Sequence, residues 1–289
     1  MKNVQYFAPA TLEEALQLLD EYGPKLSVLA GGTDLVRDMN LEYKIPDGFL
    51  WIGRLSLEYI LEEADIIRIG AATRMQTAGD SPVLRQKASA VARAAGKLAS
   101  PPVRSLATLG GNLCTASPAA DCGCALLGLG ADVQLTSKKG QRIVPLEHFY
   151  TGPGTTAIQP GELLTEIRVK PQALREGSSY MKVGRRQALT LAVLNTTSRV
   201  KLDASGKCES VKIAVGAAAP TLLRIKAAEA LLTGKPLTED AIREAAEIAV
   251  QEIQPIDDVH GTIWYRKKVT RVLVERTLRE AANMNGGNK

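Results

Sequence analysis

Two short segments of the chain combine paired glycines with small polar residues, a combination that suits an anionic ligand. The first glycine loop is Ala30-Gly31-Gly32-Thr33-Asp34-Leu35, and the second glycine loop is Thr108-Leu109-Gly110-Gly111-Asn112-Leu113. Because glycine has no Cβ atom, its backbone can approach a ligand closely and can turn several N–H groups toward one anion. A pyrophosphate needs such a cradle, so both loops are candidate parts of a nucleotide site.

Each loop taken alone is weak support for ligand binding, because Gly-Gly pairs more often mark tight turns. Neither loop supplies the G-x-G-x-x-G pattern of a dinucleotide fold, and no G-x-x-x-x-G-K-[ST] phosphate loop is present. The chain therefore has no motif for ordinary NAD binding or for ATP hydrolysis.

The elements around the loops are predicted from their hydrophobic patterns. Leu26–Ala30 is a short buried strand that leads into the first loop, and an amphipathic stretch begins at Leu35. A helix from about Pro82 to Leu98 precedes the second loop, and Asp132–Thr136 is a strand candidate after it. The alternation of strands and helices favours mixed α/β layers.

The last third of the chain has a different pattern. Val193–Val200 and Ser210–Ala217 are rich in β-branched residues and predict paired antiparallel strands, with Gly206 in the connection. Helices are expected at about 222–233, 238–253 and 263–284. We therefore expect an α+β protein with two α/β subdomains, residues 1–55 and 56–172, and a C-terminal α+β domain, residues 173–289.

The composition and charge of the chain limit the classes of function that it can have. The 289 residues carry a net charge of +5, with a pI near 9.0, but the basic residues are scattered. The densest stretch, Arg266-Lys267-Lys268 with Arg271, is interpreted as a solvated helix face rather than a nucleic-acid site.

The N-terminus lacks a signal-peptide pattern, and no run of about 18 apolar residues occurs. We therefore expect a cytoplasmic protein whose four cysteines are thiols.

Considered together, the motifs resemble a known family. LAGGTDL at 29–35, ATLGGNLCTASPAAD at 107–121, GELLTEI at 161–167 and YMKVGRR at 180–186 stand in the order and spacing of the FAD-binding middle subunit of the xanthine, carbon monoxide and nicotinate dehydrogenase family. The resemblance runs from about residue 3 to about residue 283. It implies a two-subdomain FAD-binding fold related to vanillyl-alcohol oxidase, with the C-terminal domain covering one side of the cofactor.

The resemblance also implies a set of residues that contact FAD. The first loop would receive the pyrophosphate, the second loop would hold the other side of the cofactor, Asp121 would bond the adenosine ribose, and Lys182 would lie near the flavin ring. The expected cofactor-binding residues are Leu29, Ala30, Gly31, Gly32, Thr33, Asp34, Leu35, Ala99, Thr108, Gly111, Asn112, Cys114, Asp121, Leu164 and Lys182.

Several of these residues have a simpler interpretation from the sequence alone. Asp121 suits the first turn of a helix, where a carboxylate is favourable. Lys182 has the pattern of an exposed strand lysine, and Cys114 that of a small buried hydrophobe. A cation beside the flavin would stabilise the negative charge that develops on reduction, which is the hypothesis for Lys182.

No metal site and no catalytic side chain is expected. Cys122 and Cys124, with Cys114 nearby, offer three thiolates, whereas iron–sulfur and structural zinc sites normally need four ligands, and Cys208 lies far along the chain. Neither of the two histidines has a neighbouring arrangement for nucleophilic catalysis.

The resemblance implies an oxidoreductase subunit in a molybdenum hydroxylase complex. Its FAD would take electrons from the [2Fe-2S] clusters of a small partner subunit, a large molybdopterin subunit would hydroxylate the substrate, and NAD, a quinone or another acceptor would receive the electrons. Two alternatives stay open: an independent flavin-dependent oxidoreductase without molybdenum partners, and a non-redox module that binds another phosphorylated ligand.

Overall fold

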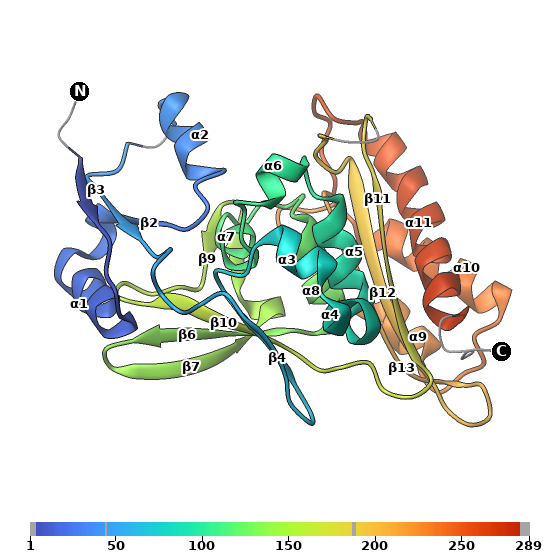
Figure 1. Ribbon diagram of the computed structural model, residues 1–289. Coiled ribbons are helices and arrows are strands. Elements are labelled where there is room, and N and C mark those ends of the chain that lie inside the picture. The colour runs from blue at the N-terminus through green and yellow to red at the C-terminus, as the bar shows by residue number, and fades with distance from the viewer. Residues whose placement is uncertain (1–3, 44, 187–188, 284–289) are drawn as a thin grey trace.

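The computed structural model of the chain describes residues 4–43, 45–186 and 189–283. A small parallel sheet with helices α1 and α2 lies at one end of the molecule (Figure 1). A five-stranded sheet and a group of short helices lie in the middle, and a sheet backed by long helices lies at the other end. The helices of the middle part and those of the C-terminus pack on opposite faces of this last sheet.

The N-terminal unit follows the expected strand, turn and helix order. Its parallel sheet has the order β1-β3-β2. Thr11 caps the helix α1, because its Oγ1 atom accepts a hydrogen bond from the Glu14 N–H at 3.2 Å. The elements are β1 Gln5–Phe7, α1 Leu12–Tyr22, η1 Gly23–Lys25, β2 Leu26–Leu29, α2 Leu35–Asn40 and β3 Gly48–Trp51.

The middle unit differs from the predicted alternation of strands and helices. Its sheet has the order β4-β5-β10-β6-β7 and is antiparallel throughout. An antiparallel sheet is possible here because all α-helices of this unit lie between β5 and β6 in the sequence. No helix is therefore needed to connect two parallel neighbouring strands. The elements are β4 Ile60–Glu62, β5 Ile67–Gly70, α3 Met75–Asp80, α4 Pro82–Lys87, α5 Ser89–Lys97, α6 Pro101–Arg104, α7 Leu109–Cys114, α8 Asp121–Leu129, β6 Asp132–Ser137, β7 Gly140–Pro145, η2 Leu146–His148, β8 Tyr150–Gly152, β9 Thr155–Thr156 and β10 Leu163–Val169.

The single helix predicted from Pro82 to Leu98 is two helices. The chain leaves the helical conformation at Ala88, where φ is −151° and ψ is 50°. Tertiary hydrogen bonds hold the break, because the N–H of Ser89 donates to the Gln172 side chain at 3.0 Å and its hydroxyl donates to the Ser178 carbonyl at 3.0 Å.

The C-terminal unit contains the predicted hairpin, with Gly206 in its turn at a φ of +82°. One strand of this unit was not predicted: the short β14, which occupies the start of the helix expected from Leu222. Strand β11, which carries Lys182, pairs with β12. The elements are β11 Glu176–Val183, β12 Leu194–Leu202, β13 Cys208–Gly216, β14 Leu223–Arg224, α9 Lys226–Leu232, α10 Glu239–Glu252 and α11 Ile263–Asn283.

The basic stretch on α11 is only partly the solvated face that its sequence suggested. Arg266 is buried, and its guanidinium bonds both carboxylate oxygens of Asp258 and the Ala217 carbonyl. Among residues 4–43, 45–186 and 189–283, none of the helices combines the length and the apolar character that a bilayer crossing requires.

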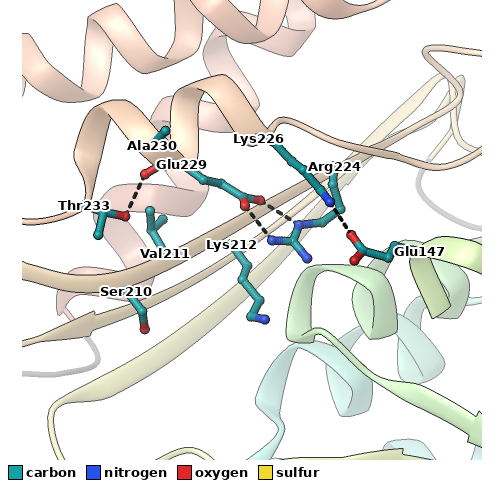
Figure 2. Close-up of a pocket in the computed structure, with 9 residues that line it drawn as sticks. All are labelled: Glu147, Ser210, Val211, Lys212, Arg224, Lys226, Glu229, Ala230 and Thr233. Atoms are coloured by element: carbon teal, nitrogen blue, oxygen red, sulfur yellow. Dashed lines mark hydrogen bonds and ion pairs between the residues drawn. The ribbon is translucent and has the colours of Figure 1, made fainter. Parts of the chain in front are cut away.

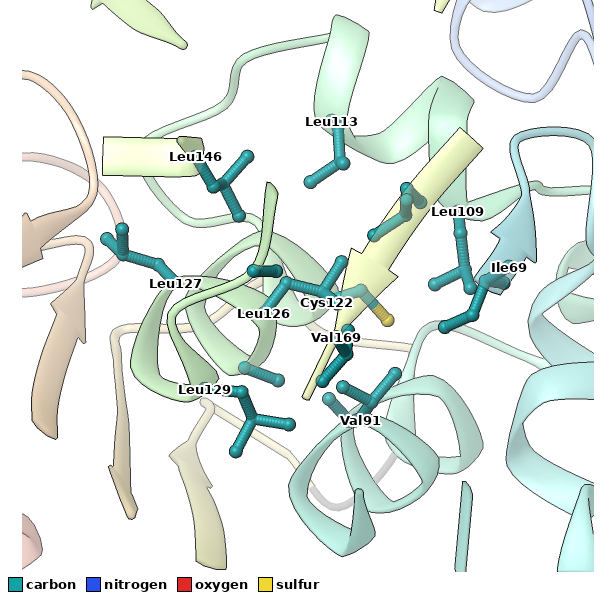
Figure 3. Close-up of a cluster of buried hydrophobic side chains, with 14 of the residues drawn as sticks. Ile69, Val91, Leu109, Leu113, Cys122, Leu126, Leu127, Leu129, Leu146 and Val169 are labelled. Atoms are coloured by element: carbon teal, nitrogen blue, oxygen red, sulfur yellow. The ribbon is translucent and has the colours of Figure 1, made fainter. Parts of the chain in front are cut away.

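Buried apolar side chains form three clusters. One lies under the N-terminal sheet around Leu50, one fills the middle unit, and one lies between the C-terminal sheet and α9–α11. In the middle cluster, Cys122 packs among Leu109, Leu126 and Val169 (Figure 3). The division of the chain at residues 55 and 172 stays a prediction.

Candidate functional site

The first glycine loop packs against the residues that flank the second glycine loop. A Cβ atom on Gly31 would stand 1.9 Å from the Leu106 carbonyl oxygen and 3.1 Å from the Ala107 Cα atom. The Thr115 hydroxyl, just after the second loop, donates to the Asp34 carboxylate at 3.0 Å. Gly31 is therefore required for the contact between the loops, because any larger side chain would push them apart.

The first loop presents a row of unused hydrogen-bond donors. Within the described part of the chain, the backbone N–H groups of Gly31, Gly32, Thr33, Asp34 and Leu35 donate to no protein acceptor. All five residues are partly accessible, and Gly32 has a φ of +71°. Successive free N–H groups in such a turn form a concave site for an anion, which is the arrangement that a pyrophosphate requires.

The second loop differs, because the protein itself uses its backbone donors. The Leu109 N–H donates to Thr73 O at 2.9 Å, and the Gly110 N–H donates to Ala71 O at 2.8 Å. The Gly111 N–H donates to the Thr108 Oγ1 atom at 3.1 Å, which caps helix α7. The expectation from sequence that both loops turn N–H groups toward the ligand is therefore wrong for the second loop.

What the second loop offers is the side chain of Asn112. Its Oδ1 atom accepts a hydrogen bond from the Gly123 N–H at 3.2 Å, at the start of α8. The amide NH₂ group makes no hydrogen bond with another described residue, so it can donate to a ligand beside the loop.

Asp121 lies at the centre of a buried polar group. It is the first residue of α8, and its Oδ1 atom accepts the Tyr180 hydroxyl at 2.5 Å and the Asn195 amide at 3.4 Å. Its Oδ2 atom accepts the Lys182 ammonium at 2.9 Å, and the side chains of Asp121 and Lys182 are each 8% exposed. We call these four residues the Asp121 cluster.

The environment of the Asp121 cluster keeps Tyr180 a hydrogen-bond donor. Burial, followed by the charge of Asp121, raises the pKa of the Tyr180 hydroxyl well above its ordinary value. The interpretation of Lys182 as an exposed strand lysine is wrong, because its charge is largely buried and paired.

Lys182 also reaches the end of α5, where Ala99 lies. Its ammonium donates to the Lys97 carbonyl at 3.2 Å and to the Thr190 carbonyl at 3.5 Å. Ala99 has a φ of +41°, and its carbonyl accepts the Leu189 N–H at 3.4 Å. The structure thus places Ala99 and Lys182 together at the C-terminal end of α5. We call this part of the protein, Lys97 to Ala99 with Lys182, the wall.

The remaining predicted residues lie in two settings. Leu164 is buried in the middle cluster on β10. Cys114 is exposed, so its interpretation as a buried hydrophobe is wrong, yet desolvation by the surrounding protein raises the pKa of its thiol to about 12.

The cysteines do not assemble into a metal centre within the described ranges. Cys122, Cys124 and Cys208 are buried free thiols, and no group of three or more His, Cys, Asp or Glu side chains with the arrangement of a metal site occurs there.

Two surface hollows are lined by residues outside the two glycine loops. One, of about 490 Å³, lies between the C-terminal sheet and α9 (Figure 2). Its charges are largely matched internally, because Arg224 pairs with Glu229 and Lys226 pairs with Glu147. The other, of about 570 Å³, adjoins the Asp121 cluster through Thr190. It is lined by Arg185, Arg186, Leu189, Thr190, Leu191 and His260.

A first loop with five free donors, the start of the second loop packed against it and a buried charge pair nearby fit a protein that binds the anionic part of a nucleotide. Residues 2–172 match the family described as FAD binding domain in molybdopterin dehydrogenase, and residues 179–281 match the CO dehydrogenase flavoprotein C-terminal domain. The chain belongs to this family of FAD-binding subunits of molybdenum hydroxylases, and it is an oxidoreductase subunit.

Individual relatives agree along nearly the whole chain. The chain is 33% identical to the nicotinate dehydrogenase FAD-subunit of Eubacterium barkeri, covering 93% of this chain and 92% of that protein. It is 31% identical to the carbon monoxide dehydrogenase medium chain of Hydrogenophaga pseudoflava, covering 96% of each. A solved structure of carbon monoxide dehydrogenase from that organism superposes with a TM-score of 0.93, covering 98% of each chain at 31% identity.

The sequence missed three residues of this region. Tyr180 and Asn195 belong to the Asp121 cluster, and Thr115 connects the two loops. One signal was available for Tyr180: it precedes Lys182 by two positions on a strand, so the two side chains lie on the same face.

Proposed function

We propose that the chain is the electron-transfer subunit of a cytoplasmic molybdenum hydroxylase complex. It takes electrons from the [2Fe-2S] clusters of a small partner subunit and passes them to NAD, a quinone or another acceptor. FAD, when bound, supplies the redox chemistry, and the chain supplies binding, orientation and electrostatic tuning. A large molybdopterin subunit carries out the hydroxylation.

One observation carries the cofactor part of this proposal: the row of unpaired N–H groups from Gly31 to Leu35. These five donors are partly accessible rather than buried, so water can satisfy them; it is their succession in one concave turn at the start of α2 that suits an anion from outside the chain. The anionic bridge of FAD fits this row. Asn112, Ala99, Asp121 and Lys182 would then hold the rest of the cofactor. Because Asp121 and Lys182 form an ion pair at 2.9 Å, the two expected contacts, Asp121 with the adenosine ribose and Lys182 with the flavin ring, cannot both hold in an extended FAD, and we assign both side chains to the flavin end.

The partner and acceptor parts are supported by the relatives. Similar proteins are named as the FAD-subunit of nicotinate dehydrogenase and the medium chain of carbon monoxide dehydrogenase, and both names describe one chain of a larger assembly. Native co-purification is the direct test: molybdenum, iron and FAD should arrive together with two further chains. Isolation of an active flavoenzyme without partners would support the independent oxidoreductase instead.

The cofactor site is tested by Gly32→Ala. An alanine at a φ of +71° is strained, and its methyl group would stand 3.3 Å from both Leu29 Cδ1 and Val36 Cγ2; the backbone strain favours a different φ at this position and so disturbs the row of donors. The purified variant should bind FAD at least about tenfold more weakly than the unaltered chain, because a loss of about 1.4 kcal/mol in binding is tenfold. Titration of flavin absorbance measures the affinity.

Gly206→Ala is the matched control. Gly206 also has a positive φ, +82°, but it lies in the β12–β13 turn, and a methyl group there would meet no atom within 4 Å. Both alanines cost about 1–2 kcal/mol of backbone strain, but only Gly32→Ala should weaken FAD. Equal FAD affinity of the two variants would contradict the role of the first loop.

A further inference from the structure

The Asp121 cluster contains two residues that the cofactor assignment does not use, Tyr180 and Asn195. Both are completely buried. They stand on neighbouring strands, because Asn195 is the cross-strand partner of Lys182 and Tyr180 is two positions before Lys182 on β11. The strand register therefore brings a hydroxyl, an amide and an ammonium to one side of the sheet, facing the start of α8.

The Asp121 carboxylate depends on these donors. A buried carboxylate is costly unless its oxygens accept hydrogen bonds or face a cation. Tyr180 makes the shortest of these contacts, 2.5 Å, on the oxygen that Lys182 does not bind, whereas the Asn195 amide stands at 3.4 Å. The Tyr180 hydroxyl thus sets the rotation of the carboxylate and directs its other oxygen toward Lys182.

The Lys182 ammonium in turn holds the end of α5. Three successive carbonyls there accept hydrogen bonds from three different elements: Lys97 O from Lys182 at 3.2 Å, Leu98 O from Arg104 at 2.9 Å, and Ala99 O from the Leu189 N–H at 3.4 Å. These bonds hold Ala99 at its φ of +41°, a conformation that alanine rarely adopts.

We propose that Tyr180 is a positioning residue of the FAD site: by donating to Asp121 it fixes the Lys182 ammonium and, through it, the wall that contains Ala99. This inference rests on the proposed function, because the wall matters only if FAD binds beside it. Tyr180 touches neither the cofactor nor the reacting atoms; its effect passes through Asp121 and Lys182.

The test is Tyr180→Phe in the full chain, which removes one hydroxyl and leaves the ring. Without this donor the carboxylate can rotate away from Lys182, and FAD must order the wall when it binds. The FAD dissociation constant should rise by about three- to tenfold, which is less than the full loss of a hydrogen bond to a charged group, because Tyr180 acts on the cofactor only through Asp121 and Lys182. The midpoint potential of the bound flavin should fall, because the cation beside it is held less firmly.

Tyr59→Phe is the matched control. The Tyr59 hydroxyl also donates to a buried carboxylate, that of Glu166, at 2.7 Å, and this carboxylate pairs with Arg68 in the middle sheet. The two variants lose equivalent hydrogen bonds, so a purely structural role of Tyr180 would give both the same FAD affinity and the same flavin potential.

Three outcomes decide the matter. Weaker FAD binding and a lower potential in Tyr180→Phe alone support the positioning role. Equal behaviour of the two variants, in a chain that does bind FAD, overturns this role and leaves the proposed function standing. An unaltered chain that binds no FAD overturns the proposed function and this inference together. Thermal melts of both variants without FAD check that each is folded.

Discussion

The buried pair of Lys182 and Asp121 allows a quantitative test of how the C-terminal unit is joined to α8. Lys182→Met keeps the unbranched apolar part of the side chain but removes the charged ammonium, so the Asp121 carboxylate retains only the neutral donors of Tyr180 and Asn195. Removing one partner of a buried ion pair costs about 3–5 kcal/mol, because the other charge is left without compensation. With both side chains 8% exposed, we expect about 3 kcal/mol here.

Urea unfolding of the chain without FAD measures this cost as a lower midpoint at an unchanged slope. Lys201→Met is the control, because Lys201 pairs with Glu209 at side-chain exposures of 31% and 49% and such exposed pairs contribute about 0.2–1 kcal/mol. The double variant Asp121→Asn/Lys182→Met should recover at least about 1 kcal/mol of the loss, because it leaves no buried charge. The argument fails if Lys182→Met costs no more than Lys201→Met.

Two further predictions concern packing and acid stability. Gly128→Ala should destabilise the chain by about 1–3 kcal/mol, because its Cβ would stand 2.6 Å from Thr197 Cβ on β12. Gly96→Ala in α5, whose Cβ would meet nothing within 4 Å, should instead stabilise the chain by about 0.5–1 kcal/mol. Melting temperatures of the two variants that shift in the same direction would contradict this. Burial alone would raise the pKa of Glu176, but the bonds with Arg199 and the Ala173 N–H and the charges of Arg199 and Lys201 together outweigh burial and lower the pKa. Its contribution is therefore fully present above the unfolded glutamate pKa of about 4.3 and is lost as pH falls through the lower folded-state pKa. In a stability profile from neutral pH to acid, Glu176→Gln should lose less below that pH than the unaltered chain does, and parallel profiles would refute the assignment.

The parts of the fold that follow from local pattern were predictable. Thr11 and Glu14 identify a helix start, and the β-branched runs on either side of Gly206 identify a hairpin, because both signals act within a few residues. The break at Ala88 was not predictable, because alanine favours helices and the bonds that hold the break come from Gln172 and Ser178, more than eighty positions away.

The candidate site, like the fold, could be predicted from the sequence only in part. The sequence singled out both loops, Asp121 and Lys182, but it gave the two side chains separate roles and did not pair them. It did not show that the N–H groups of the second loop are already used, because their acceptors, Ala71 and Thr73, lie on a separate segment. It also placed Lys182 in solvent, because its partner Asp121 stands 61 positions earlier and only the packing of β11 on the start of α8 brings them together.

The contact of Gly31 with the Leu106 carbonyl has a consequence for how a ligand enters. Because the first glycine loop already packs against Leu106, its backbone loses little conformational entropy when a nucleotide binds. The entropic cost of association is therefore mainly that of the ligand. Uptake and release should therefore depend on desolvation and on the rest of the surrounding wall, rather than on a slow closing of the turn itself.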